Sequence, residues 1–340
     1  MTRDHENRRF ADLKRELPPL SDFASAAIQK MRAPSAMQII CIDVTNKCDL
    51  ACSNCTRLLE NQVGFWDMTP ENFRKALQSL AGFPGVIAVI GGNPCMHPDF
   101  PALCDIIAEE MPDKSKRGLW TNNFFKHRDL ADRTFGFFNL NPHGDARGEK
   151  SLAPYRKRSR YGLAYHSGHS VHSPILTAVK DLFDEERMWD RISKCDINQN
   201  WSASIVQNKG QLRAYFCEVA ASFDLARGQD HGMDVVEGWW KRAITDFSGQ
   251  ISRFCPGCGI PARIPGTVDA DETDTFTASN RDIVENAIRN GRKVAEITSA
   301  DGVIEQWHKV TDYSGTLQPK GPVRRFRRKL KKFISHYAGW

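Results

Sequence analysis

Cysteines form the clearest chemical pattern in this sequence. Cys48, Cys52 and Cys55 lie in a short polar stretch, residues 45–57, at the spacing Cys-x3-Cys-x2-Cys. Thiolates hold iron–sulfur clusters, and a [4Fe–4S] cubane has four irons, so three cysteines leave one iron open to an exogenous ligand. A structural zinc ion takes four closed ligands, and no other His or Cys stands beside these three to complete such a site. We therefore predict a [4Fe–4S] cluster here rather than zinc.

A pair of glycines marks a second place where a ligand is expected. Gly91 and Gly92 follow an apolar stretch, residues 86–90, and precede Asn93 and Pro94. Because glycine has no side chain, the backbone at such a pair can approach a ligand closely. Alone, Gly-Gly-x-Pro is typical of an ordinary turn. Together with the cysteine spacing, it resembles the radical S-adenosylmethionine (radical SAM) enzymes.

The resemblance implies where SAM binds. In radical SAM enzymes the amino and carboxylate groups of SAM chelate the open iron, and the backbone of a Gly-Gly-Glu motif contacts the amino group. Here Asn93 replaces the usual Glu, and Asn54 stands where the family has an aromatic residue near the adenine. The stretch 119–123 resembles the Thr-Asn-Gly ending of the family's third strand. The predicted cofactor-binding residues are Gly91, Gly92, Asn93, Asn54, Thr121 and Asn122.

Four further cysteines form a second set in the C-terminal half of the chain. They are Cys195, Cys217, Cys255 and Cys258, of which the last two enclose a Cys-Pro-Gly-Cys knuckle. The stretch 202–217 is typical of a hairpin, and the residues after it of a helix. A knuckle alone does not separate zinc from iron, and a zinc ribbon is the alternative. The order hairpin, helix and cysteine knuckle, in a chain that also resembles radical SAM enzymes, resembles a twitch domain, the short form of the SPASM domain. This resemblance implies an auxiliary [4Fe–4S] cluster. Four cysteine ligands would leave that cluster no open iron, so its role would be electron transfer.

Alternating patterns predict the elements that position these residues. Strands are expected over 37–44, 86–90, 135–141 and at 119–123, with helices beginning after Thr69 and over 99–111. This alternation predicts an α/β fold with a parallel sheet. The resemblance makes it a partial (β/α)6 radical SAM barrel, with its functional groups at the carboxyl ends of the strands, followed by a small α+β twitch-like cluster-binding domain. The predicted division is an N-terminal extension at 1–36, the barrel at 37–190, the auxiliary domain at 191–262, a C-terminal extension at 263–319 and a basic tail at 320–340.

The stretch between barrel and second cysteine set is basic and contains histidines. His166, His169 and His172 recur at every third position among Ser and Gly. No carboxylate partner is evident, so we expect a solvated or substrate-facing loop rather than a metal site. An apolar face predicts a helix over 174–193. Residues 263–318 show no readable chemistry beyond an acidic loop and a short helix over 280–288.

The composition of the chain indicates the cellular compartment in which the protein is expected. The chain has 340 residues, of which 41% are hydrophobic, enough for a sizeable core. No uncharged apolar stretch is long enough to span a bilayer, and no apolar segment follows the charged N-terminus as in a secretory signal. Ten cysteines without such a signal favour metal or redox use in a reducing compartment. We therefore expect a cytoplasmic protein.

The net charge of +6 belongs to the tail. Eight Lys and Arg lie within residues 320–332, and the rest of the chain is close to neutral. Residues 322–337 also place an apolar stripe opposite these charges, as in a helix that lies on an anionic membrane surface. We predict such attachment at the inner membrane face; a helix docked on the protein body is the alternative. Nucleic acid is not favoured, because no aromatic stacking platform accompanies the charges.

The resemblance implies an activity. Radical SAM enzymes take one electron, here expected from a flavodoxin or ferredoxin-type reductant, cleave SAM and abstract a hydrogen atom from the substrate. A single four-cysteine auxiliary site resembles the dehydrogenases and epimerases of aminocyclitols and sugars. We therefore predict oxidation or epimerisation of a secondary alcohol on a small carbohydrate or cyclitol. Cys95, which follows the glycine motif, is the candidate thiol donor for epimerisation. Modification of a peptide or nucleobase, and a non-catalytic iron–sulfur scaffold, are the alternatives.

Overall fold

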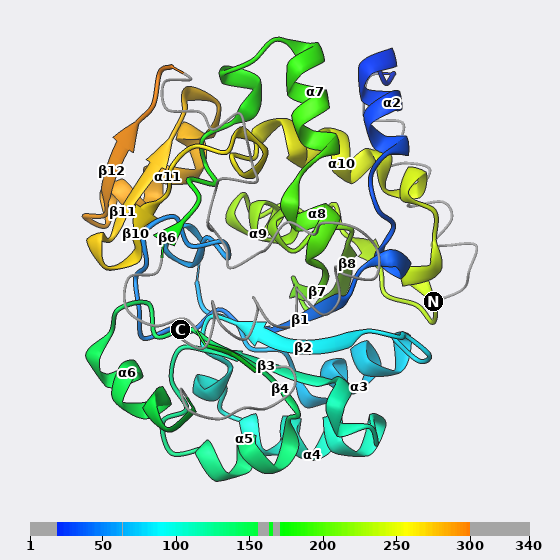
Figure 1. Cartoon of the computed structure of the whole chain (residues 1–340), viewed down its shortest axis with the longest axis vertical. Helices are drawn as coiled ribbons and strands as arrows, with labels where there is room; N and C mark the ends of the chain where they lie inside the picture. Colours follow the sequence, from blue (N-terminus) through cyan, green and yellow to red (C-terminus); the bar gives the residue numbers. More distant parts are fainter. Residues whose placement is uncertain (1–18, 63, 156–162, 166–170, 300–340) are drawn as a thin grey trace, which may run out of the picture.

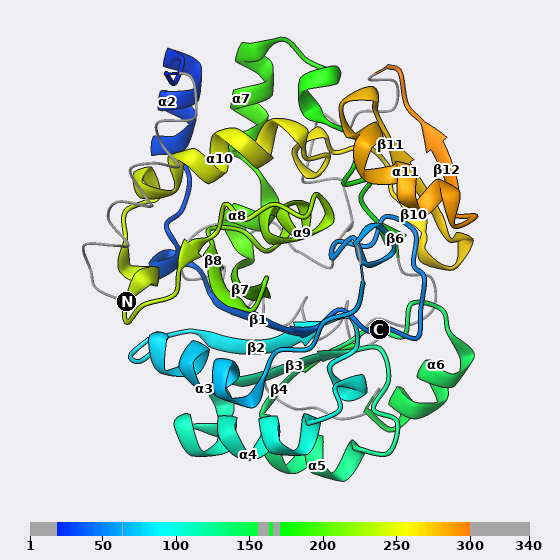
Figure 2. The same ribbon diagram turned by 180° about the vertical axis from the view of Figure 1, so that it is seen from behind.

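The structure is a computed structural model that describes residues 19–62, 64–155, 163–165 and 171–299. An eight-stranded sheet of order β5-β4-β3-β2-β1-β7-β8-β9 runs through its middle. Figure 1 shows helices α3–α5 on one face of this sheet and α2 and α7–α10 on the other. The view from behind shows the same two helical layers (Figure 2). The predicted α/β class with a parallel sheet is confirmed.

The strands and helices have the following bounds. The strands are β1 (Ile39–Thr45), β2 (Val86–Gly91), β3 (Arg117–Thr121), β4 (Phe137–Leu140), β5 (Leu163–Tyr165), β6 (Val171–His172), β7 (Ser202–Asn208), β8 (Gln211–Tyr215), β9 (Met233–Asp234), β10 (Thr267–Val268), β11 (Thr273–Phe276) and β12 (Lys293–Glu296). The α-helices are α2 (Asp22–Gln29), α3 (Pro70–Ser79), α4 (Phe100–Glu110), α5 (Arg128–Thr134), α6 (Ala146–Leu152), α7 (Glu185–Ser193), α8 (Asp196–Asn200), α9 (Glu218–Ala226), α10 (Ser248–Phe254) and α11 (Arg281–Arg289).

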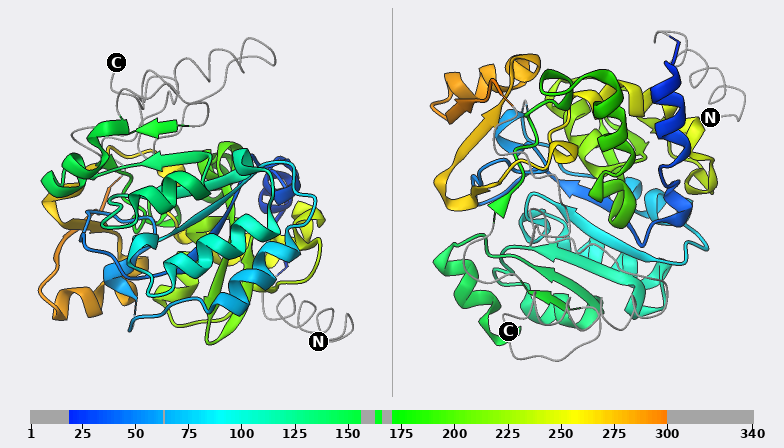
Figure 3. Two further views of the ribbon diagram at one scale, coloured as in Figure 1. Left: turned by 90° about the horizontal axis from the view of Figure 1, so that it is seen from below. Right: turned by 45° about the horizontal axis from the view of Figure 1, so that its top comes forward.

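Strand β1 is the centre of the sheet. All of its residues are buried, and it pairs in parallel with β2 on one edge and β7 on the other. A strand buried along its length needs partners on both edges, because its backbone N–H and C=O groups have no water to bond. Strands β1 to β5 follow one another across the sheet in chain order. Seen from below, the helices between them lie across one face (Figure 3). The carboxyl ends of these parallel strands therefore share one edge.

Helix α3 begins as the sequence predicts. The Thr69 hydroxyl accepts a hydrogen bond from the backbone N–H of Asn72, and Pro70 takes the first helical position, where its missing N–H costs nothing. Phe73, Ala76 and Leu77 are buried, whereas the opposite side of the helix faces solvent. The helix thus covers the sheet directly after the cysteine loop.

The predicted hairpin over 202–217 is confirmed. Strands β7 and β8 pair antiparallel, and Lys209 and Gly210 in the turn between them have φ of 49° and 78°. Two positive φ values suit the right-handed twist of a hairpin. Because β7 also pairs with β1, the main sheet continues past the predicted boundary at 190/191. The division into domains stays a prediction.

The predicted helix over 174–193 is wrong in its first half. Helix α7 begins at Glu185, after Asp184, whose carboxylate accepts from the backbone N–H of Arg187. Before it, the carbonyls of Ile175 and Leu176 accept from Gly259 and Thr277, which are distant in the chain. These carbonyls are therefore not used in a helix, although the apolar side chains suggest one.

Two sequence predictions lie wholly or partly outside the described residues. Of the N-terminal extension predicted at 1–36, the structure describes residues 19–36, where α2 begins after the Ser21 cap. The basic tail at 320–340 is not described, so its predicted membrane attachment stays a prediction. In the part of the chain that is described, no helix has the length and apolar character needed to cross a bilayer.

Candidate cluster sites

The first cysteine set lies on the loop between β1 and α3. Burial raises the pKa of the Cys48 thiol to about 12 and raises the pKa of Cys52 and Cys55 as well. The neighbouring charges of Asp269, Cys55 and Cys48 raise the pKa of Cys52 further. The three thiols thus lie close enough to repel one another as thiolates. A bound cation that offsets this charge would be needed to keep all three deprotonated.

The spacing of these thiols suits something larger than a single ion. Tetrahedral zinc, with Zn–S bonds of about 2.3 Å, holds its sulfurs only about 3.8 Å apart. Among the described residues, neither cysteine set contains three sulfurs that all lie within 4.8 Å of one another. A four-iron cluster spreads its cysteine ligands over different irons. The donor type of Cys48, Cys52 and Cys55 therefore fits such a cluster, and their sulfurs are not gathered around one point as a single zinc ion would require.

The paired glycines support the start of this loop. A Cβ on Gly91 would lie 2.2 Å from the carbonyl oxygen of Thr45, and one on Gly92 would lie 2.2 Å from that of Lys47. The backbone N–H of Gly92 donates to the Thr45 carbonyl at 2.8 Å, and that of Asn93 to the Lys47 carbonyl at 2.7 Å. Glycine is needed here so that two backbones can touch. The predicted contact of this motif with SAM stays a prediction.

Asn93 and Cys95 meet Thr121 beneath the glycine motif. The Asn93 amide oxygen accepts from the Thr121 hydroxyl at 2.9 Å and from the backbone N–H of Cys95 at 3.0 Å. The Cys95 thiol is 4% exposed, and its sulfur lies 3.9 Å from the Thr121 oxygen. Burial raises the pKa of this thiol well above its usual range. Three predicted site residues are thus brought together, with Cys95 as a protonated thiol.

Asn122 joins the strand ends to the cysteine loop. Its amide donates to the carboxylate of Asp49, the residue after Cys48, at 2.9 Å. Asn122 is buried, as is Thr121 before it. The carboxyl end of β3 is therefore tied directly to the loop that carries the first cysteine set.

The side chain of Asn54 bonds to the C-terminal segment. It is 1% exposed and has a left-handed backbone with φ of 49°. Its amide nitrogen donates to the Thr267 hydroxyl at 3.1 Å, and its amide oxygen accepts from the backbone N–H and hydroxyl of Thr275. Both amide atoms thus hold the C-terminal segment. The predicted contact of Asn54 with SAM stays a prediction.

The C-terminal segment 267–296 encloses the cysteine loop, which sequence reasoning missed. Arg292 donates to the carbonyl oxygens of Ala51 at 2.5 Å and Cys52 at 2.7 Å, and pairs with Asp274 at 3.0 Å. The Asp274 carboxylate also accepts from the backbone N–H of Asn54 at 2.7 Å. The contacts of Arg292 and Asp274 with the cysteine loop join residues 220 or more positions apart in the chain, so no local pattern could reveal them.

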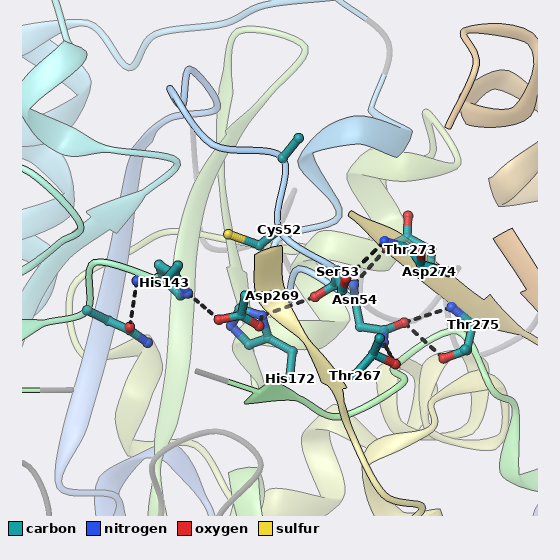
Figure 4. Close-up of polar contacts among 12 residues, drawn as sticks. Cys52, Ser53, Asn54, His143, His172, Thr267, Asp269, Thr273, Asp274 and Thr275 are labelled. Carbon is teal, nitrogen blue, oxygen red and sulfur yellow. Dashed lines mark hydrogen bonds and ion pairs between the residues drawn. The ribbon is translucent and has the colours of Figure 1, made fainter. Parts of the chain in front are cut away.

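Asp269 holds two histidines beside Cys52 (Figure 4). Its carboxylate oxygens lie 2.6 Å from Nδ1 of His143 and 2.7 Å from Nδ1 of His172, which also lies 3.1 Å from the Ser53 carbonyl. The Asp269 side chain is completely buried. Burial opposes its ionisation, but the charge of His172 and the hydrogen bonds of both imidazoles hold its pKa well below the usual range. Burial also lowers the pKa of His143. Burial opposes the charge of His172 as well, but the Asp269 charge and the hydrogen bonds to Asp269 and the Ser53 carbonyl together raise its pKa.

The expectation of a solvated histidine loop without a carboxylate partner is therefore wrong for His172. Its side chain is 12% exposed and ion-paired with Asp269. The physical reason is a contact between the short strands β6 and β10, which pair antiparallel. His166 and His169 lie outside the described residues.

The second cysteine set converges from three helical turns. Cys195 and Cys217 stand at the N-terminal ends of α8 and α9. Burial raises the pKa of both thiols, to about 11 for Cys195, although backbone N–H groups of the first helical turn oppose the shift. Cys255 and Cys258 enclose a tight turn, in which the Cys258 N–H donates to the Cys255 carbonyl at 3.1 Å. Burial raises the pKa of Cys255 and Cys258, and the thiolates of Cys195 and Cys217 raise both further. The four predicted ligands thus face one another.

A buried ion network connects the two cysteine sets. Arg57, two positions after Cys55, pairs with Glu218 at 2.9 Å, and Glu218 follows Cys217 directly. Arg57 also pairs with Asp43 of β1 at 2.9 Å. The Arg57 and Glu218 side chains are 6% and 4% exposed. No sequence pattern indicated this pairing, because Arg57 and Glu218 are 161 positions apart.

Comparison with known proteins adds little. No protein-family model matches the chain, and no curated protein matches it. Among solved structures, the chain is similar to BtrN in complex with AdoMet and 2-DOIA, with a TM-score of 0.44 and 14% identity over 65% of this chain and 92% of that one. It is also similar to methylornithine synthase (PylB), with a TM-score of 0.26 and 15% identity over 95% of this chain and 91% of that one. At this level of structural overlap, neither likeness carries an argument about the activity of the chain.

Proposed function

We propose that this chain is a radical SAM enzyme. Cys48, Cys52 and Cys55 would hold a [4Fe–4S] cluster whose open iron binds SAM, and the bound pair would supply a one-electron cleavage that yields a hydrogen-abstracting radical. The observation that carries the proposal is the gathering of three thiols at the carboxyl end of β1, at a spacing wider than one ion needs. A flavodoxin or ferredoxin-type protein would be the reductant.

The second cysteine set would hold an auxiliary [4Fe–4S] cluster. Support comes from four cysteines that face one another, of which Cys217 and Cys258 are buried and Cys195 and Cys255 are partly buried. Among the described residues, no three of their sulfurs all lie within 4.8 Å of one another. With Cys195, Cys217, Cys255 and Cys258 all as ligands, that cluster would accept or donate electrons rather than bind substrate. The domain division at 190/191 and 262/263 belongs to the same proposal.

The substrate would be a small carbohydrate or cyclitol that loses hydrogen from a secondary alcohol carbon. Polar side chains gather at the carboxyl ends of β2, β3 and β4, where the parallel fold places its functional groups: Asn93, Thr121, Asn122 and His143. Cys95 remains a protonated thiol in this group. A protonated thiol can return a hydrogen atom to a carbon radical, as epimerisation requires.

The test distinguishes oxidation from epimerisation. Anaerobically reconstituted, reduced protein is incubated with SAM and a panel of polyols and aminocyclitols in heavy water. Deuterium on a substrate carbon, with no turnover in Cys95→Ala, establishes epimerisation. A ketone product with an unaffected Cys95→Ala variant establishes dehydrogenation. SAM cleavage that none of these compounds stimulates would remove the proposed substrate class.

A further inference from the structure

Three donor atoms of different kinds meet at Cys52. The Cys52 sulfur, a ring nitrogen of His143 and a carboxylate oxygen of Asp269 all lie within 4.8 Å of one another. They come from three parts of the chain: the cysteine loop, the loop after β4, and the turn after β10 (Figure 4). We propose that these three residues bind a single divalent transition-metal ion, such as Zn²⁺, when the chain lacks its first cluster.

The donor set suits such an ion. Zinc binds Cys sulfur at about 2.3 Å, His nitrogen at about 2.0–2.1 Å and Asp oxygen at about 2.0–2.2 Å, which places donor atoms about 3.3–3.6 Å apart in a tetrahedron. The triad needs only a small adjustment to reach these distances. Thiolate with imidazole selects zinc, iron or cobalt over magnesium and calcium, which prefer oxygen donors alone. Three protein ligands leave the fourth position to water.

Binding exchanges protons for the ion. The proton that His143 Nδ1 now donates to the Asp269 carboxylate across 2.6 Å moves through solvent to Nε2, which keeps the imidazole neutral, and the ion takes its place at Nδ1. The Cys52 thiol releases its proton to solvent on binding. Cys52 and His143 are partly exposed, which gives the ion a path to the site.

Neighbouring groups already orient the carboxylate. His172 pairs with the second oxygen of Asp269 at 2.7 Å, and the Ser53 N–H donates to the Asp269 main-chain carbonyl at 2.9 Å. Metal ligands are commonly held in this way by hydrogen bonds from residues that do not touch the metal. His172 is therefore a positioning residue, and replacing it leaves all three ligands in place.

The ion and the first cluster exclude each other, because both use Cys52. This exclusion rests on the proposed function, whereas the ion site itself does not. Zinc would hold the loop in a cluster-free form, and the ion must leave before four irons assemble. Zinc supplied during reconstitution should therefore reduce cluster formation at the first site and leave the second site to its own four cysteines.

The experiment counts tightly bound zinc in the metal-free, thiol-reduced, full-length protein. Zinc is titrated anaerobically against a chromophoric chelator for wild type, His143→Ala, Cys52→Ala, Cys48→Ala and His172→Ala. Any zinc bound by the four-cysteine set adds the same number to the count of every variant. Differences in the zinc count between variants therefore come from the site of Cys52, His143 and Asp269. We expect His143→Ala and Cys52→Ala each to bind one zinc fewer than wild type. Cys48→Ala and His172→Ala should keep the wild-type count.

The opposite pattern would overturn the proposal. If Cys48→Ala loses a zinc and His143→Ala keeps it, the ion is held by thiolates alone. If His143→Ala does not fold, Asp269→Asn provides the same comparison, and cobalt-loaded Cys48→Ala protein should show a nitrogen ligand from ¹⁵N-labelled histidine by pulsed EPR. Absence of that coupling also refutes the site. Zinc counts do not depend on SAM cleavage, so failure here and failure of the proposed function are separate results.

Discussion

Arg57 is a single residue on which both cysteine sets depend. It lies buried between Asp43 and Glu218, each at 2.9 Å. Glu218 also accepts from the Ser202 hydroxyl and, at 3.4 Å, from the Cys41 thiol. Burial opposes the charge of Arg57, but the two carboxylates outweigh it and raise the pKa of Arg57 further. The Arg57 guanidinium thus compensates the negative charge of Asp43 and Glu218, which are buried away from water.

Replacing Arg57 should destabilise the protein strongly. Arg57→Met leaves Asp43 and Glu218 buried without their cation, and breaking a buried pair on one side typically costs about 3–5 kcal/mol. Urea unfolding of the purified chain measures the difference in free energy. Arg74→Met is the matched control, because Arg74 pairs with Glu109 and Glu110 at the surface and should change stability little. An equal loss in the free energy of unfolding of the two variants would show that the buried Arg57 network stabilises the protein no more than a surface ion pair.

His97 predicts a pH dependence of stability. Its side chain is 2% exposed; Nε2 donates to the Met68 carbonyl at 2.9 Å, and Nδ1 accepts from the Asp99 N–H at 3.0 Å. Burial lowers the pKa of His97, although the Met68 bond and nearby carboxylates oppose the shift. The unfolded chain therefore binds a proton more readily, and this stabilisation is present above about pH 6.5 and lost as pH falls through the lowered pKa.

The comparison of wild type with His97→Gln isolates this effect. Other histidines titrate in both proteins and cancel in the difference. The free energy of unfolding, measured in urea at pH 7 and at pH 5, should fall more steeply for wild type than for His97→Gln. Parallel declines would mean that His97 is not held neutral by the fold.

Among the elements, those with local signals were predictable. The cap at Thr69, the alternation of strands and helices, and the turn at Lys209 and Gly210 each depend on neighbouring residues, and each is confirmed. The segment 267–296 was not predictable, since its role lies in contacts with residues 51–54. The same holds for Ile175 and Leu176, whose carbonyls bond to distant N–H groups instead of forming a helix.

This enclosing segment should determine how firmly the first site holds metal. Arg292→Met removes the donors to the Ala51 and Cys52 carbonyls and leaves Asp274 unpaired on that side. We expect reconstituted Arg292→Met to lose iron from the first site during gel filtration, up to about four irons per chain, while the second site keeps its own. Iron and EPR analysis after the column measure the loss.

Arg289→Met is the control for this experiment. Arg289 is the last residue of α11, three positions before Arg292, but it is exposed and bonds only to Asn286 among the contacts seen for its side chain in the described residues. Its replacement should leave the iron content unchanged. Loss of iron from both variants would point to general destabilisation of α11 rather than to the Arg292 contacts.

At the scale of the whole molecule, one sheet joins the two cysteine sets. The first set follows β1. In the second set, Cys195 precedes β7, the strand next to β1, Cys217 follows β8, and Cys255 and Cys258 follow α10. Figure 1 places α8 and α9 on the face opposite α3–α5. The Arg57–Glu218 pair crosses between the loops. If both sets hold clusters, electrons would pass between them through this sheet and the loops that the Arg57–Glu218 pair connects.

The formation of 5′-deoxyadenosine tests the central claim most directly. Reconstituted, reduced wild type should carry about eight irons per chain and release 5′-deoxyadenosine from SAM. The variant with Cys48, Cys52 and Cys55 all changed to Ala should keep about four irons at the second set and release none. Release by that variant, or no release by wild type that carries both clusters, would contradict the account.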